Sequence, residues 1–435
     1  MKRRHFLEYI GGFYLASSFR DICAAVPRGD KFWKLLRKQF LLPPDYHYLN
    51  TGGLGSSPLT VIHTVKKMMD REDMHPVPGH DEPHFWKIKE KCAALFGPGI
   101  KKEELAFTST ATEGINVIVN GLPLKPGDEI ITSTHEHVAL NVPLLYKMKT
   151  GGIVIKLFEP DIQNGMANVD RIRKLITERT RLIFTSHITC TTGQILPVKE
   201  IGELAKSSGV WYALDGVQAF GHMPLNLKDI HADFYAVSGH KWLLGPKRTG
   251  VLYVKESLLD ILKPSIVGAY STRLNDIVGG KVELQPSAQR YEFGTQNDAL
   301  FYGLEAALDF NAAIGSRTIW EHNKECSEMF YRGLEKIPEV EILSPREENY
   351  RSSMLTFRMK DRANKKFSRF LERRGFRVRH VPEAELDGIR VSFHIYNDRE
   401  EVVRLLEEIK KLPYLREDEI QAAKRVSKTV DNKGF

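Results

Sequence analysis

Between residues 59 and 260, short apolar runs alternate with stretches that carry the apolar spacing of amphipathic helices. Parallel neighbouring strands need a crossover connection between them, so this alternation predicts a mostly parallel sheet with helices on both faces. The chain is therefore expected to be an α/β protein. The expected strands are 105–109, 129–133, 153–158, 181–186, 210–214, 233–238 and 250–254, and the expected helices are 112–120, 138–147, 170–176 and 198–207.

The rest of the chain divides into shorter units. An amphipathic stretch and a turn-rich segment precede the alternating region, and a mixed helical and strand pattern follows it. The strands expected in that later part contain MLTFRM, GFRVRHV and GIRVSFH. The predicted units are an N-terminal arm (27–58), a large domain (59–300), a small C-terminal α+β domain (301–414) that begins with a connector helix (301–314), and a polar tail (415–435).

Composition excludes several classes of protein. The 435 residues are 42% hydrophobic and 27% charged, which is ordinary for a globular chain and excludes disorder or a coiled coil. We see no apolar run near the ~18 residues that a membrane-spanning helix needs. The four cysteines show no CxxC spacing, so neither a metal site nor a disulfide framework is expected. The net charge of +8 is spread along the chain, so nucleic acid is not an expected partner.

The first 26 residues resemble a twin-arginine export signal. A basic pair at 3–4 precedes an apolar pair and a modest apolar stretch at 10–19, and small residues follow at 23–25. Export of the folded protein to the periplasm is the expectation. The alternative is a cytoplasmic protein with an amphipathic arm, which the charged residues at 20–21 favour.

Two expected strands end in residues able to do chemistry. One ends at Asp215, and the next ends at Ser238, just before His240 and Lys241. Ligands of open α/β sheets bind at the carboxyl ends of strands, so these residues are expected in one crevice. A lysine among apolar neighbours is partly desolvated, which lowers its pKa and frees the amine to attack a carbonyl. On these residues alone, a buried Asp215–Lys241 ion pair or an exposed lysine remains an alternative.

A second segment, FTSTATEGINVIVNGL at 107–122, indicates an anion site. Thr110, Ala111 and Thr112 lead into a helix expected to begin near Glu113. The N-terminus of a helix presents unpaired N–H groups and a partial positive charge, which suits a phosphate dianion. An ordinary N-cap by Thr110 or Thr112 is the alternative.

These segments resemble a known family. Residues 238–254, SGHKWLLGPKRTGVLYV, are similar to the Schiff-base segment of the class V aminotransferases, and 215–221, DGVQAFG, to their Asp-Gly-x-Gln segment. These are fold type I pyridoxal phosphate (PLP) enzymes, among them cysteine desulfurases and isopenicillin N epimerase-like proteins. The resemblance covers about residues 46–412. It implies PLP as cofactor and a large domain, with a mostly parallel seven-stranded sheet, beside a small α+β domain.

The resemblance also implies roles around the cofactor ring. Lys241 would hold PLP as an internal aldimine and then move protons at the substrate α-carbon. Asp215 would pair with the protonated pyridine nitrogen, which keeps the ring an electron sink. Gln218 would hydrogen-bond the phenolic oxygen. His137, in STHEHVALNVP, would stack on the ring and can shuttle protons, whereas a core or capping histidine is the alternative.

The same resemblance implies a set of phosphate ligands. They are the backbone N–H of Ala111, the hydroxyl of Thr112, Ser238 and His240. RYEFGTQN at 290–297 is similar to a family segment whose threonine reaches the phosphate of the neighbouring subunit. Thr295 therefore implies a homodimer with its two sites at the interface, although a turn and N-cap is the alternative.

Substrate binding is expected at the small domain. Arg390, in GIRVSFHIYN, matches the arginine that the family uses to hold the α-carboxylate of its substrate. A guanidinium offers a planar, two-pronged donor and so fixes the orientation of the substrate. Arg379 is a weaker candidate.

Two departures bear on the subfamily. Desulfurases carry a nucleophilic cysteine before this arginine, but 378–390, VRHVPEAELDGIR, contains none. Cys190 stands where desulfurases usually place Asn, which is more like the epimerase branch. The expected function is a PLP-dependent enzyme acting on an amino acid or amino-acid-containing metabolite through an external aldimine and an α-carbanion, with epimerase-like or aminotransferase chemistry. A PLP-dependent carbon–sulfur lyase is the alternative. A second alternative is a cofactor-free binding protein, which the presence of the complete set of site residues disfavours.

Overall fold

The computed structural model describes Phe19, residues 22–23, 26–360 and 362–415. The expected export signal at 1–26 lies almost wholly outside the described residues, and so does the expected polar tail. Within the described part of the chain, no helix is long and apolar enough to cross a membrane.

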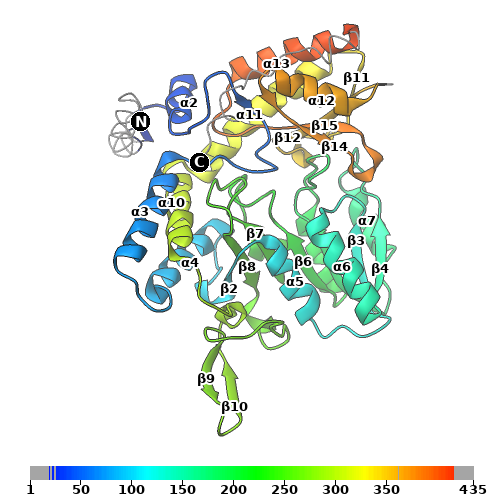
Figure 1. Ribbon diagram of the computed structural model, residues 1–435. Coiled ribbons are helices and arrows are strands. Elements are labelled where there is room, and N and C mark those ends of the chain that lie inside the picture. Colours follow the sequence, from blue (N-terminus) through cyan, green and yellow to red (C-terminus); the bar gives the residue numbers. More distant parts are fainter. Residues whose placement is uncertain (1–18, 20–21, 24–25, 361, 416–435) are drawn as a thin grey trace.

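A seven-stranded sheet forms the centre of the molecule (Figure 1), with the strand order β2-β8-β7-β6-β5-β3-β4. Strand β8 is antiparallel to both of its neighbours, and the other neighbouring pairs are parallel. The predicted α/β fold with a mostly parallel sheet is therefore confirmed, and each strand end lies within one residue of its expected position. The strands are β2 (Leu105–Thr108), β3 (Glu129–Ser133), β4 (Val154–Phe158), β5 (Thr180–Ser186), β6 (Trp211–Asp215), β7 (Phe234–Ser238) and β8 (Gly250–Val254).

The sheet is buried on both faces because alternate residues of its strands enter two different hydrophobic clusters. Leu182 and Phe184 pack with helices on one face, whereas Ile183 packs on the other. The first face is covered by α5 (Ala111–Gly121) and α6 (Val138–Gly151). The second is covered by α3 (Leu59–Met74), α4 (Glu82–Phe96), α7 (Ala167–Arg173), α8 (Val198–Ser207), α9 (Leu227–Ile230) and α10 (Asp298–Ile314).

A second, antiparallel sheet lies at the top of Figure 1, with the order β11-β12-β15-β14 and its own hydrophobic cluster. The expected segment 375–381 divides into two strands, because β13 pairs with the N-terminal arm through β1 instead of joining this sheet. The elements are α2 (Asp30–Arg37), β1 (His47–Tyr48), α11 (Ser316–Leu334), β11 (Val340–Ile342), β12 (Met354–Met359), α12 (Asn364–Arg373), β13 (Phe376–Arg377), β14 (Arg379–Val381), β15 (Gly388–Ser392) and α13 (Arg399–Lys411).

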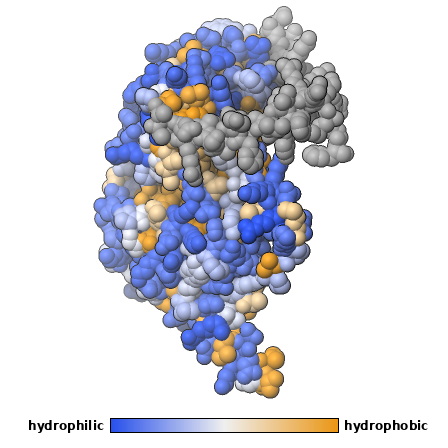
Figure 2. Space-filling view, turned by 90° about the vertical axis from the view of Figure 1, so that its left-hand side faces the viewer, coloured by the Kyte–Doolittle hydropathy of each residue, from blue (hydrophilic) through white to orange (hydrophobic). Residues whose placement is uncertain are grey.

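A β-hairpin that the sequence patterns did not predict projects from the lower end of the molecule (Figures 1 and 2). It consists of β9 (Thr272–Asp276) and β10 (Lys281–Leu284). Ile277 and Val278 at its turn are each 96% exposed.

The carboxyl ends of the parallel strands meet the second sheet and the arm. Ser186 lies opposite Asp215, and Asp215 opposite Ala236, so β5, β6 and β7 end at one edge. Asn50 of the arm pairs with Ser392 at the end of β15. This arrangement places three separate parts of the chain around one edge of the sheet.

Candidate active site

Lys241 lies at the carboxyl edge of the sheet, three residues beyond the end of β7. The arm packs closely on it, since a Cβ at Gly55 would lie 2.1 Å from the Lys241 carbonyl oxygen. Burial lowers the pKa of Lys241 to about 8, although the charges of Asp215 and Cys190 oppose this. Among the described residues, the Lys241 amine has no hydrogen-bond partner. It is therefore a free amine whose pKa lies near neutrality.

Asp215 ends the adjacent strand and is 6% exposed. Its Oδ1 accepts a hydrogen bond from the Val217 backbone N–H at 3.0 Å. Burial raises the pKa of Asp215, and the Val217 N–H and the charge of Lys241 act in the opposite direction. The two groups are close enough to influence each other, but within the described part of the chain they do not form an ion pair. The alternative of a buried Asp215–Lys241 ion pair is therefore not what the structure shows.

Gln218 joins the arm to the segment after Lys241. Its Nε2 donates to the Gly52 carbonyl at 3.0 Å, and its Oε1 accepts from Trp242 Nε1 at 2.7 Å. His222 stacks on the Trp242 ring, with centroids 3.5 Å apart. Since the amide oxygen is occupied, only the second Nε2 hydrogen of Gln218 is left to meet a cofactor oxygen.

His137 begins α6 as its N-cap, with Nδ1 accepting from the Ala139 backbone N–H at 3.1 Å. The capping interpretation is thus correct for Nδ1, and Nε2 remains for another partner. Burial lowers the pKa of His137 to about 4, helped by the charges of Lys241 and Arg379. The imidazole is therefore neutral at physiological pH.

The preceding residue, Glu136, is 3% exposed and was missed in the sequence. It accepts hydrogen bonds from Ser133 Oγ at 2.6 Å and from the Ser186 backbone N–H at 3.0 Å. These bonds tie the loop that carries His137 to the end of β5. Burial raises the pKa of Glu136 to about 7 against the effect of these bonds.

The predicted phosphate site forms where α5 meets the end of β7. Thr110 is the N-cap of α5 and accepts from the Glu113 backbone N–H at 3.3 Å, so the capping interpretation holds for Thr110. The Ala111 backbone N–H donates to Ser238 Oγ at 2.9 Å. The Thr112 side chain lies on the exposed side of this helix start.

His240 completes this region, because its Nδ1 is buried and has no hydrogen-bond partner among the described residues. Burial lowers the pKa of His240 to about 4, with the charges of Lys241 and Lys247 acting in the same direction. The N-terminus of α5 and the Ser238 hydroxyl thus meet at the end of β7, and His240, with its unpartnered imidazole nitrogen, follows two residues later, next to Lys241 in the chain. This set fits the phosphate of PLP, and the lysine and Asp215 fit its aldehyde and pyridine nitrogen.

Arg390, on β15, is 2% exposed and reaches the same edge. Its Nη1 donates to the Cys190 carbonyl at 2.6 Å and its Nη2 to Asn50 Oδ1 at 3.2 Å, while its Nε is buried without a partner. Burial lowers the pKa of Arg390 to about 10, so the group stays cationic at neutral pH. Burial raises the pKa of the Cys190 thiol to about 11, which keeps it protonated. Asn50 was also missed, because only the fold brings the arm to β15.

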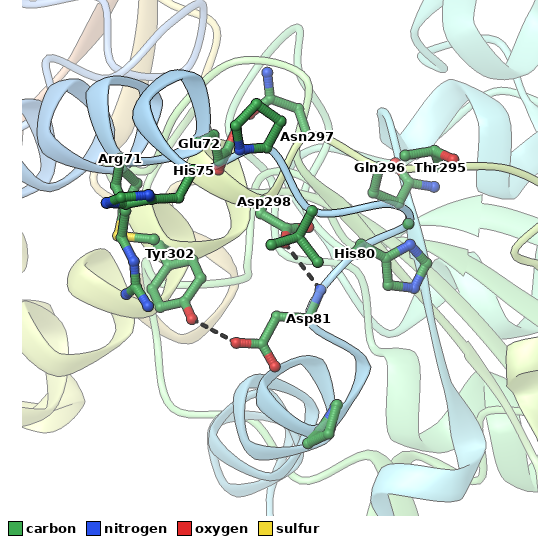
Figure 3. Close-up of a pocket in the computed structure, with 15 residues that line it drawn as sticks. Arg71, Glu72, His75, His80, Asp81, Thr295, Gln296, Asn297, Asp298 and Tyr302 are labelled. Atoms are coloured by element: carbon green, nitrogen blue, oxygen red, sulfur yellow. Dashed lines mark hydrogen bonds between the residues drawn. The ribbon is translucent and has the colours of Figure 1, made fainter.

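Thr295 lies elsewhere. It is exposed and lines a cavity of about 760 Å³ between α3, α4 and the start of α10 (Figure 3). In that cavity Tyr302 donates to Asp81 at 2.8 Å, and the Asp81 backbone N–H donates to Asp298 at 2.9 Å. The described residues that line this cavity do not include the predicted cofactor ligands at the sheet edge. The structure therefore separates Thr295 from the other predicted site residues within one chain.

Comparisons with known proteins agree with this geometry. The family model described as Aminotransferase class-V matches residues 67–405. A probable cysteine desulfurase of Methanothermobacter thermautotrophicus is 28% identical, covering 87% of this chain and 97% of its own. The isopenicillin N epimerase of Amycolatopsis lactamdurans is 29% identical, covering 87% and 98%. A solved structure of the cystine C–S lyase C-DES with its product cysteine persulfide matches with a TM-score of 0.77 and 25% identity, covering 84% of this chain and 98% of its own.

These matches confirm the predicted family, the predicted fold and PLP as the cofactor of an enzyme. They favour the alternative of carbon–sulfur bond cleavage over the main prediction of epimerase or aminotransferase chemistry. The chain belongs to the class V aminotransferase family of PLP-dependent enzymes.

Proposed function

We propose that the protein is a PLP-dependent carbon–sulfur lyase that acts on a cysteine-derived amino acid. The observation that carries the proposal is the unpartnered Lys241 amine, with its pKa of about 8, at the strand edge that also holds Asp215 and Arg390. Such a group can take a proton from an α-carbon at neutral pH. The similarity to desulfurases and to C-DES favours a C–S bond as the bond that breaks.

The residues divide into those that hold the cofactor and those that act on the substrate. The Ala111 N–H, Ser238 and His240 would hold the phosphate, and Asp215 and His137 would hold the ring. PLP, when bound, supplies a conjugated ring that withdraws electrons from the substrate α-carbon.

Arg390 binds the α-carboxylate through its free Nε–H and the adjoining Nη–H groups, and so orients the α-carbon. Lys241 then takes the α-proton. The electron pair left at the α-carbon forms the Cα–Cβ double bond as the Cβ–S bond breaks, and the sulfur leaves as a thiolate that takes up a proton. The three-carbon fragment reacts with one water to give pyruvate and ammonium. In total, one thioether amino acid and one water are consumed, and one thiol, one pyruvate and one ammonium are released.

Sulfur transfer to a protein cysteine has little support in this chain. The loop before Arg390 contains no cysteine, and the last cysteine of the sequence is Cys326. Cys190 is 4% exposed, and burial raises its pKa to about 11, so it is a poor nucleophile. We therefore expect the sulfur to leave as a free thiol or, from a disulfide substrate, as a persulfide.

The experiment is to incubate the PLP-loaded enzyme with S-ethyl-L-cysteine, L-cystine and L-cysteine and to measure thiol, pyruvate and alanine. A lyase releases thiol and pyruvate in equal amounts. Alanine formed with sulfide would instead indicate desulfurase chemistry, and recovery of the D-amino acid without thiol would indicate the epimerase that the 29% identical relative represents. Lys241→Ala should abolish the release, and Lys247→Ala, a change at an exposed lysine nearby, is the matched control.

We also propose that the enzyme is a homodimer in which Thr295 serves the site of the partner. Its support is the exposure of Thr295 at a cavity separate from Lys241, together with the family resemblance of its segment. Light scattering on the eluting protein should give twice the chain mass of 49.6 kDa. A stable monomer with full activity would contradict the proposal.

Export by the twin-arginine route is a further proposal, and it rests on the pair Arg3 and Arg4. Fractionation of cells should find the protein in the periplasm, and replacing both arginines by lysine should retain it in the cytoplasm. An unprocessed chain found only in the cytoplasm would favour the cytoplasmic alternative.

A further inference from the structure

A second arginine faces the same site as Arg390. Strands β14 and β15 are antiparallel, and Arg379 lies directly opposite Arg390 in their register. Side chains of directly opposed residues project from the same face of a sheet. The charge of Arg379 contributes to lowering the pKa of both Lys241 and His137, which agrees with this placement. The site therefore contains one more cation than the α-carboxylate of an amino acid requires.

Glu383, just after β14, forms an ion pair with Arg379. Its Oε2 is buried and has no hydrogen-bond partner among the described residues. Burial acts to raise the pKa of Glu383, but the polarity of its own backbone N–H, the ion pair with Arg379 and the charge of Arg390 together lower it, so the group is a carboxylate at neutral pH. A buried carboxylate oxygen without a donor is costly, and a ligand that brings a donor would remove that cost.

The loop that carries Glu383 has an unusual backbone. Ala384, Glu385 and Asp387 have φ values of 51°, 56° and 41°, in the left-handed region that non-glycine residues seldom adopt. Such conformations persist where the surrounding structure imposes them, and they concentrate at binding sites. This loop leads directly into β15 and Arg390. The charge of Arg390 contributes to lowering the pKa of Glu383, which agrees with a position of Glu383 near that arginine.

We propose that Glu383 contacts the substrate and selects cysteine derivatives whose sulfur substituent ends in a hydrogen-bond donor, above all an ammonium group, over those that end in a carboxylate. The inference rests on the proposed lyase function and adds the class of substrate. Arg379 is the positioning residue, since it holds one oxygen of Glu383 and leaves the other for the ligand.

The preference follows from the charges. Arg390 is neutralised by the α-carboxylate of the bound amino acid, and Arg379 by Glu383. A distal ammonium finds the free Oε2 of Glu383 as an acceptor, whereas a distal carboxylate meets a like charge at the same place. A substrate with an apolar end neither donates a hydrogen bond to Glu383 nor is repelled by its charge.

The test compares three cysteine thioethers of similar size: S-(2-aminoethyl)-L-cysteine, S-ethyl-L-cysteine and S-carboxymethyl-L-cysteine. The PLP-loaded enzyme is titrated with each, and the change of its visible absorption band gives a half-saturating concentration without any need for turnover. We expect the aminoethyl compound to bind at least tenfold more tightly than the carboxymethyl compound. In Glu383→Gln this ratio should fall below threefold, while S-ethyl-L-cysteine keeps its half-saturating concentration.

Glu385→Gln is the matched control, because it removes an exposed carboxylate two residues away in the same loop. It should leave the ratio unchanged. A native enzyme that prefers the carboxymethyl compound, or binds all three alike, overturns the proposal, and so does a Glu383→Gln enzyme with the native ratio. The native ranking needs no variant, so misfolding of a variant does not remove the test. Thiol release is measured separately: binding without release contradicts the lyase function alone, whereas release without a ranking contradicts this inference alone.

Discussion

The free amine of Lys241 leads to a prediction about how the apoprotein captures its cofactor. A pKa of about 8 instead of 10.5 corresponds to a difference of about 3 kcal/mol between the two protonation states. At pH 7.5 about a quarter of the Lys241 side chains are then unprotonated, against roughly one in a thousand for an ordinary lysine. Since only the unprotonated amine attacks an aldehyde, the rate of PLP capture should rise with pH to a midpoint near 8.

Asp215→Asn is the informative perturbation. The Asp215 carboxylate raises the pKa of Lys241, so its removal should move the midpoint below 8. Arg390→Gln removes a cation that lowers the pKa of Lys241 and should move the midpoint upward. The two variants thus predict shifts of opposite sign.

The assay follows the visible absorption band of the apoprotein after it is mixed with PLP, from pH 6 to 10. The variants are compared by the pH midpoint of their capture rate and not by their affinity for PLP, because Asp215 also contacts the cofactor in the proposed mode of binding. A native midpoint at or above 10, or an upward shift in Asp215→Asn, would show that burial does not lower the pKa of Lys241 in this way.

Further predictions concern stability, measured by urea unfolding of the apoprotein. The pKa of Lys241 is lower in the folded protein than in the unfolded chain, so the free energy of unfolding is highest at high pH and decreases as the pH falls from above 10 through 8. At pH 7, Lys241→Met should therefore be more stable than the native protein by about 3 kcal/mol, and this difference in stability should disappear above pH 10. Lys89→Met should cost about 3–5 kcal/mol, because it leaves Glu292 buried without the partner it now holds at 2.7 Å, and a neutral cost would contradict this. Burial lowers the pKa of His222 to about 3 and that of His394 to about 4. The free energy of unfolding should therefore decrease by about 3 kcal/mol for each histidine as the pH falls from 6.5 towards 4. His222→Asn should lose less stability than the native protein over that range.

Local pattern was sufficient for the central sheet. Its strands are short apolar runs bounded by turns, and burial on both faces makes such runs easy to recognise. The hairpin β9–β10 was not predicted, because its strands are mostly exposed and do not alternate between a buried and a solvent face. Its turn places two exposed apolar residues, Ile277 and Val278, before two glycines.

Some residues of the candidate site could likewise be predicted from local patterns, and others could not. Asp215 and Lys241 were predicted because each follows an apolar strand, and strand ends of a parallel sheet meet at one edge. Glu136 and Asn50 were missed, since neither stands in a pattern that separates it from an ordinary loop residue. Glu383 was also missed, because the loop that carries it matches no known pattern.

The fold class and the residues at the strand ends could be predicted from the sequence alone, because they depend on periodicity and spacing within short segments. The family could be predicted from the resemblance of 215–221 and 238–254 to known segments. The environment of each of these groups depends on contacts that form only in the folded chain. Gln218 meets Gly52 across 166 residues and Arg390 meets Cys190 across 200, and no local pattern encodes such contacts. The pKa of Lys241, the free oxygen of Glu383 and the separation of Thr295 from the sheet edge all depend on burial and distance, which exist only once the chain has folded.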